Sequence, residues 1–195
     1  AISLNNNRIS QISTTALTGT VFYLDLANNM LTNLNPAVFS RINSTLQTLD
    51  LLNNRIAMLD GESFANLRNV QTLNLNGNAM FSITGNTFQP LANLNFLGLW
   101  NCALNSLNVE WFNGLSNLRI LYLGSNGLTE LPANVFNPLT SLAELHIYNN
   151  RIVQLRRDAF GASLPSITTI YAPANSFNVI DPEVVTAASS LNYLY

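Results

Sequence analysis

Asparagine recurs at a nearly fixed interval along the chain. The pattern L-x-x-L-x-L-x-x-N-x-L-x-x-L can be laid on the sequence so that its asparagine position falls at Asn7, Asn29, Asn54, Asn78, Cys102, Asn126, Asn150 and Asn175. The successive intervals are 22, 25, 24, 24, 24, 24 and 25 residues. Repeats of this length stack on one another, because one unit alone cannot bury its own apolar side chains. The sequence therefore predicts a single domain over residues 1–195, built from about eight stacked repeats.

Each repeat is expected to form one turn of a coil. A well-preserved copy carries Leu118, Leu121, Leu123, Asn126, Leu128, Leu131, Phe136 and Leu139. In the short segment L-x-L, the two leucines point inward and the residue between them points outward, so stacked segments give a parallel sheet. The asparagine amide satisfies backbone groups of the turn that follows. In the second half of the repeats, a buried aromatic column is expected at Phe39, Phe64, Phe88, Phe112, Phe136 and Phe160, with Val185 in its place in the last repeat.

These motifs resemble the leucine-rich-repeat family, in the typical 24-residue extracellular class found in Toll-type receptors, Slit, the variable lymphocyte receptors of jawless fish and secreted insect immune proteins. The resemblance covers nearly the whole chain. It implies an α/β solenoid in the form of a right-handed horseshoe, with a parallel sheet on the concave face and irregular or 3-10 segments on the convex face. It also implies a secreted or extracellular protein. Because the chain starts inside one strand pattern and ends inside another, we expect one or both terminal caps to be missing.

Charge is sparse and restricts the partners. The chain has 8 basic residues, all arginine, against 10 acidic residues. This composition gives no basic surface for a nucleic acid backbone, and no apolar run approaches the roughly 20 residues needed to cross a bilayer. We therefore expect no nucleic acid partner and no direct membrane insertion.

Nothing in the sequence indicates catalysis, a cofactor or a metal. With one cysteine, no intrachain disulfide is possible, and Cys102 in the asparagine position is interpreted as a buried thiol. A nucleophilic thiol needs a nearby base, but the single histidine, His146, lies two repeats away and on the other side of the sheet.

The outward positions of the strands are not dictated by the core, so they are where function is sought. From the fifth repeat onward they carry large side chains, and the predicted ligand-binding residues are Phe96, Trp100, Ile120, Tyr122, His146, Tyr148 and Tyr171. An exposed patch of this kind is a common binding hot spot. Gly98 and Gly124 lie among these residues and predict a shallow pocket. Two alternatives are that the aromatic residues only pair across strands, or that they seal a homodimer or a missing cap, since Tyr193 and Tyr195 extend the patch.

Two smaller features are polar. Asp25 and Asp50 occupy the same column on adjacent strands, a secondary acidic patch whose spacing resembles a retaining glycosidase pair but lacks a cleft and a neighbouring histidine or arginine. A cation held with help from Asn28 or Asn53, or a solvated acidic surface, are the other interpretations. The triplet Asn43-Ser44-Thr45 is an N-glycosylation acceptor in a loop between repeats.

Together these features predict an extracellular recognition module that binds a protein or a glycan on its concave face, as a receptor ectodomain or a secreted immune protein. The alternative is a structural protein that uses the same patch for self-association. Fold alone does not decide between them.

Overall fold

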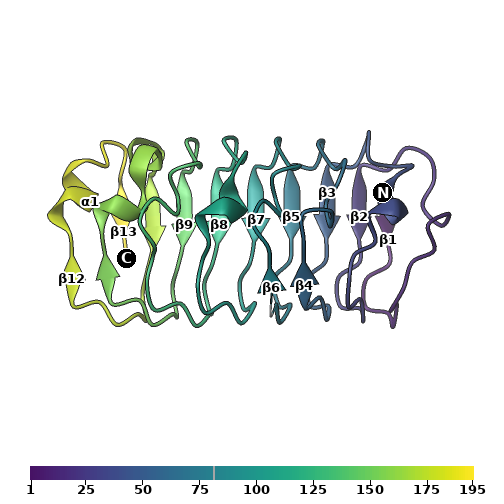
Figure 1. Ribbon diagram of the computed structural model, residues 1–195, viewed down its shortest axis with the longest axis horizontal. Coiled ribbons are helices and arrows are strands. Elements are labelled where there is room, and N and C mark those ends of the chain that lie inside the picture. Colours follow the sequence, from purple (N-terminus) through teal and green to yellow (C-terminus); the bar gives the residue numbers. More distant parts are fainter. Residues whose placement is uncertain (81) are drawn as a thin grey trace.

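The computed structural model describes residues 1–80 and 82–195 and confirms the solenoid. Nine strands form one parallel sheet, the main sheet, in the order β1 (Ile2–Ser3), β2 (Tyr23–Asp25), β3 (Thr48–Asp50), β5 (Thr72–Asn74), β7 (Phe96–Gly98), β8 (Ile120–Tyr122), β9 (Glu144–His146), β11 (Thr169–Tyr171) and β13 (Tyr193–Leu194). These strands lie side by side along the long axis of the molecule (Figure 1). Each repeat thus adds one strand.

The return segments carry short elements on the opposite side of the core. Two pairs of two-residue strands form small parallel sheets, β4 (Met58–Leu59) with β6 (Ser82–Ile83), and β10 (Gln154–Leu155) with β12 (Val179–Ile180). The helices are the 3-10 helices η1 (Pro36–Phe39), η2 (Val109–Phe112), η3 (Arg157–Ala159) and η4 (Gly161–Ser166), and the α-helix α1 (Pro182–Thr186). None of the described helices is long and apolar enough to span a bilayer.

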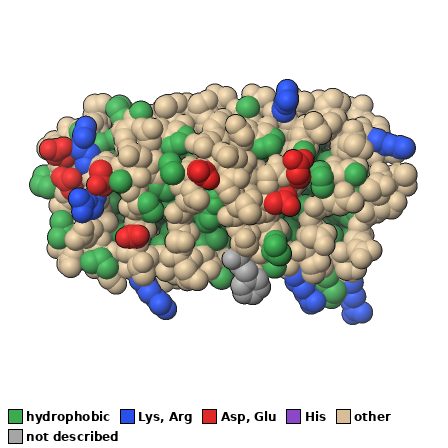
Figure 2. All heavy atoms as spheres, in the orientation of Figure 1, with side chains coloured by type: hydrophobic (Ala, Val, Ile, Leu, Met, Phe, Trp, Pro, Cys, Tyr) green, Lys and Arg blue, Asp and Glu red, His purple; other side chains and the backbone are tan. Residues whose placement is uncertain are grey.

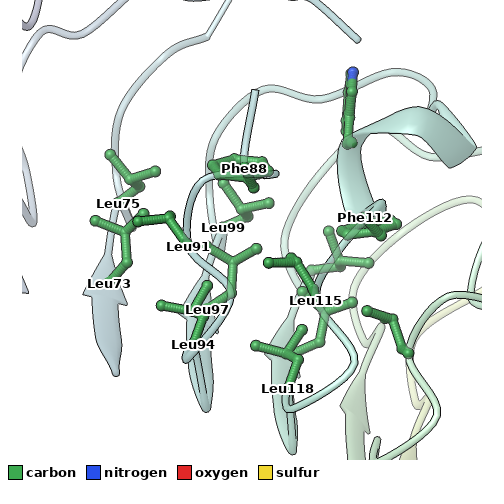
Figure 3. Packing of buried hydrophobic residues seen from close by; sticks show 14 of the residues in the cluster. Leu73, Leu75, Phe88, Leu91, Leu94, Leu97, Leu99, Phe112, Leu115 and Leu118 are labelled. Carbon is green, nitrogen blue, oxygen red and sulfur yellow. The ribbon is translucent and has the colours of Figure 1, made fainter. Parts of the chain in front are cut away.

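The core lies between the main sheet and the return segments. Inward strand leucines such as Leu97, Leu99 and Leu121 are fully buried, and so is the phenylalanine column (Figure 3). Ring centroids of successive members lie 5.7 Å apart for Phe64 and Phe88, and 6.1 Å apart for Phe112 and Phe136. Each repeat therefore buries its aromatic ring against its neighbour's.

The last member of that column was assigned one residue too late. Val184 is fully buried, whereas Val185 is 51% exposed, so Val184 takes the place of the phenylalanine. The reason is the start of α1: Asp181 caps this helix by accepting a hydrogen bond from the Glu183 N–H at 2.9 Å, and the turn that follows points Val184 inward.

The repeated asparagines form a ladder along the edge where the strands end. Asn78 is typical: its amide nitrogen donates to the Leu75 carbonyl of its own repeat at 2.8 Å and to the Leu51 carbonyl of the preceding repeat at 3.0 Å, and its oxygen accepts the Ile56 N–H at 3.0 Å. At Cys102 the thiol donates to the Leu75 carbonyl at 3.3 Å, and the Cys102 carbonyl accepts the Met80 N–H at 3.0 Å. The predicted structural role of this position is confirmed.

Candidate binding face

The side chains of the main sheet that point away from the core define what we call the outer face, the predicted concave face. Parallel pairing places Tyr122 beside His146 and His146 beside Tyr171. Their ring centroids lie 4.1 Å and 4.5 Å apart, and the rings of His146 and Tyr171 are stacked at an interplanar angle of 19°. The prediction that these three residues lie on neighbouring strands of the same face is therefore confirmed.

The stack continues in both directions. Tyr195 stacks on Tyr171 at 4.9 Å and 5°, and Tyr193 stacks on Tyr195 at 5.8 Å. At the other end, Phe96 meets Tyr122 edge to face at 5.2 Å. We call the run of rings Phe96, Tyr122, His146, Tyr171, Tyr195 and Tyr193 the aromatic column.

Stacking leaves the column only partly exposed. All seven predicted binding residues are half-buried, whereas Tyr193 and Tyr195 are exposed. Within the column, the rings of His146 and Tyr171 are stacked and the ring of Tyr122 packs on His146 at a tilt of 46°, so mainly ring edges and polar atoms remain for a partner. Cross-strand pairing, the simpler interpretation, is thus present, and it pre-orders the same surface.

The predicted pocket beside the glycines is wrong. A Cβ atom built on Gly124 would lie 2.8–3.0 Å from three ring atoms of Tyr148, which means that the Tyr148 ring covers this glycine. A Cβ atom on Gly98 would lie 2.7 Å from the Asn76 side-chain oxygen, and that oxygen accepts the Trp100 N–H at 2.7 Å. The two glycines are therefore sites of close packing, because neighbouring side chains fold into the space that a side chain would fill.

Trp100 carries an unusual polar atom. Its indole nitrogen Nε1 is buried and, among the described residues, it is the buried side-chain nitrogen or oxygen without a hydrogen-bond partner. Most buried polar groups are hydrogen-bonded, so the indole N–H of Trp100 is an exception to that rule.

His146 is the titratable centre of the aromatic column. Its Nε2 lies 3.5 Å from Oε2 of Glu144, and only 12% of its side chain is exposed, against 42% for Glu144. Burial lowers the pKa of His146 below its ordinary value, although Glu144 acts in the opposite direction. Because its pKa lies below the ordinary value, the His146 imidazole is neutral at pH 7. Burial also raises the pKa of the Tyr122 hydroxyl, and Glu144 is the next cause of that shift.

Glu144 was absent from the predicted site. It is the first residue of β9, two positions before His146, so both side chains point to the outer face. The alternation of inward and outward residues along the strand places Glu144 on the outer face, but the prediction selected large aromatic and apolar side chains there.

The acidic pair is placed as expected and is occupied by internal contacts. Asp25 and Asp50 are register partners on β2 and β3. Asp25 is buried and accepts hydrogen bonds from the Ala27 N–H at 3.0 Å, from the Ser3 hydroxyl at 3.3 Å and from the Asn5 amide. Asp50 accepts the Leu52 N–H at 2.9 Å. Partial burial raises the pKa of the Tyr23 hydroxyl, and the carboxylates of Asp25 and Asp50 raise it further.

The asparagines proposed to assist a cation there pair with each other instead. The Asn53 amide donates to the Asn28 side-chain oxygen at 2.9 Å. Among the described residues, no group of three His, Cys, Asp or Glu side chains converges as a metal site.

Cys102 and Asn43 are the remaining predicted positions. Cys102 is buried, and burial raises the pKa of its thiol to about 11, so the thiol is protonated at neutral pH. Asn43 is half-exposed in the turn between η1 and β3, and the Thr45 hydroxyl of its triplet donates to the Val21 carbonyl at 3.0 Å.

A family model described as "Leucine rich repeat" matches residues 44–104 and 97–152, which together span more than half of the chain. The chain belongs to the leucine-rich-repeat family. It is similar to Toll in a structure of the Toll–Spatzle complex from Drosophila, with a TM-score of 0.86 and 25% identity over 99% of this chain and 26% of that chain. It is also similar to TLR13 in a crystal structure of a TLR13–ssRNA13 complex, with a TM-score of 0.66 and 24% identity over 88% of this chain and 28% of that chain. This chain thus spans about a quarter of the length of those two chains. No curated protein sequence matches it.

Proposed function

We propose that this chain is an extracellular recognition module whose outer face binds a protein partner through the aromatic column and the adjoining Trp100 and Tyr148. The observation that carries the proposal is the unbroken run of contacting rings, tilted or stacked, across β8, β9, β11 and the end of the chain. The core needs only the inward residues of these strands, so it does not account for aromatic residues at the outward positions. Tyr and Trp at such positions are typical binding hot spots.

The two similar structures supply the context of the proposal. In the similar structure, a glycosylated form of Toll is in complex with Spatzle, a complex of Drosophila development and innate immunity. A corresponding role for this chain is as part of an immune receptor ectodomain or secreted immune protein, with a glycan on Asn43. Asn43 precedes β3, away from the aromatic column, so that glycan leaves the column free.

A protein partner fits the aromatic column better than a glycan does. A sugar ring needs a free aromatic face for stacking, but His146 and Tyr171 are stacked on each other and the Tyr122 ring packs at a tilt on His146. The hydroxyls of the partly exposed tyrosines instead offer hydrogen bonds to peptide groups of a partner.

Nucleic acid is a less favoured class of ligand, mainly on electrostatic grounds. The similar TLR13 structure contains single-stranded RNA, so the fold itself is compatible with this class of ligand. However, RNA binding needs basic residues along the phosphate backbone and free ring faces for the bases. The outer face of this chain offers Asp50 and Glu144 where cations are needed.

The experiment compares the wild type with a Trp100→Ala/Tyr122→Ala double variant, after circular dichroism has verified that both are folded. A photo-crosslinking residue at Tyr148 identifies a partner in extracellular fluid, and the same residue at Glu130, which is exposed outside the main sheet, is the control. The purified partner is then titrated against both proteins. We expect weaker binding to the double variant, whereas equal binding to both would refute the assignment.

Self-association is the second candidate, because Tyr193 and Tyr195 expose more than half of their surface at the end of the column. Sedimentation of both proteins over a wide range of concentrations separates it from recognition. If only the wild type associates, the aromatic column is an assembly surface.

A further inference from the structure

The charged residues of the outer face are of one sign. Among the described residues, the charged side chains at outward strand positions are Asp25, Asp50 and Glu144. The arginines lie elsewhere: in the turns after strands, before strands, or on the return segments, at Arg8, Arg41, Arg55, Arg68, Arg119, Arg151, Arg156 and Arg157. In Figure 2, blue side chains project from the two long edges of the molecule and mix with carboxylates at one end. The charged groups at outward positions of the main sheet are therefore carboxylates, of which Asp50 and Glu144 are partly exposed, and the arginines lie outside these positions.

We propose that the partner presents a cationic segment to the aromatic half of this face, with arginine or lysine side chains as the recognised groups. The proposal rests on the proposed function and adds the chemistry of the partner. Glu144 is the anchor: it belongs to β9, the strand that carries His146, its side chain is 42% exposed, and its carboxylate lies 3.5 Å from Nε2 of the neutral His146. No described arginine pairs with it, since the ion pairs of the arginines are Arg156–Asp158 and Arg157–Glu183.

The residues around Glu144 suit a guanidinium or an ammonium group. Glu144 acts on the pKa of the Tyr122 hydroxyl, which places this hydroxyl in the neighbourhood of the carboxylate. Tyrosine hydroxyl oxygens of Tyr122 and Tyr171 accept hydrogen bonds from the same donors. Opposite charges across an interface also steer the encounter and exclude wrong partners.

The same charges disfavour a second copy of this chain as the occupant. In a two-fold dimer the same surface meets itself, so Glu144 and Asp50 of both copies would be buried in one interface. The outer face supplies no arginine to compensate them, and an unpaired buried charge is costly. A cationic protein removes this cost.

The test measures the fluorescence anisotropy of short labelled oligoarginine, oligolysine and oligoglutamate peptides on the folded wild-type chain, at low and at physiological salt. Glu144→Gln removes the anchoring charge with little change in shape. Glu130→Gln is the matched control, because Glu130 is also exposed but lies outside the main sheet. Both variants lower the negative charge of the chain equally, so nonspecific attraction to an acidic protein affects them alike.

We expect the basic peptides to bind more tightly than oligoglutamate, and Glu144→Gln to weaken them by about two- to fivefold, as for one partly exposed ion pair. Glu130→Gln should leave the affinity unchanged. Equal binding of the basic and acidic peptides, or equal losses in the two variants, overturns the proposal. If a partner identified by crosslinking at Tyr148 binds through the aromatic column but oligoarginine does not compete with it, the cationic chemistry is wrong while the proposed function stands.

Discussion

The asparagine ladder gives the sharpest prediction about what holds the binding face in place. Replacing Asn78 by alanine removes a side chain that is fully buried. The Leu51 carbonyl keeps a bond from the Asn54 amide at 3.1 Å, and the Leu75 carbonyl keeps one from the Cys102 thiol, but the Ile56 N–H loses its acceptor. A stranded buried N–H costs about 1–3 kcal/mol and each lost hydrogen bond about 0.5–1.5 kcal/mol. The free energy of unfolding should therefore fall by about 2–5 kcal/mol.

Urea unfolding followed by circular dichroism measures this loss from the midpoint and the slope. The matched control is Asn93→Ala, which removes an exposed amide bonded to the Arg68 carbonyl at 2.8 Å and should cost less than about 1 kcal/mol. Asn78→Cys should cost less than Asn78→Ala, because Cys102 shows that a thiol can donate in this ladder. If Asn78→Ala costs no more than Asn93→Ala, the ladder is not a source of stability and the reasoning fails.

Three further predictions concern single side chains. Cys102 should not react with a thiol reagent at neutral pH while the chain is folded, and should react on unfolding, because its thiol is buried with a pKa of about 11; rapid labelling of the folded protein would contradict this. Burial lowers the pKa of His146 in the folded chain below its ordinary value of about 6.5. At a pH between these two values, His146 binds a proton in the unfolded chain but not in the folded chain. The free energy of unfolding of the wild type should therefore decline as the pH falls through this interval, and the decline should be smaller in His146→Gln; parallel melting-temperature profiles would refute it. Gly124→Ala should displace the Tyr148 ring, since the added Cβ lies 2.8 Å from it, and should change the near-ultraviolet circular dichroism while the far-ultraviolet spectrum stays the same.

The repeat pattern was enough to predict the fold because each inward position is repeated. Leu97, Leu121 and Leu145 carry the same information, so an error at one position is corrected by the others. Where repetition ends, the prediction was wrong by one residue: the last repeat has no phenylalanine, and only the cap of α1 decides that Val184 rather than Val185 turns inward.

The sequence predicted which residues of the candidate site lie next to one another, but not how their side chains shape the surface. The register of parallel strands follows from the period, and it brought Tyr122, His146 and Tyr171 together. The pocket beside Gly124 failed because the position of a ring depends on rotamers, and the Tyr148 side chain folded over the glycine. Whether a protein is bound there is not contained in the repeat, so it stays a proposal.

The stacking of the aromatic column also bears on how tightly such a face can bind. A side chain that is free in the unbound protein loses rotamer freedom when a partner immobilises it, at about 0.5–1.5 kcal/mol for each flexible side chain. His146 is held between Tyr122 and Tyr171, and Tyr171 is held between His146 and Tyr195, so much of that freedom is already lost when the chain folds. The cross-strand pairing that first looked like an alternative to binding therefore favours it, because the solenoid orders the rings before a partner arrives. A partner that meets Glu144 among these rings then needs to order mainly its own side chains.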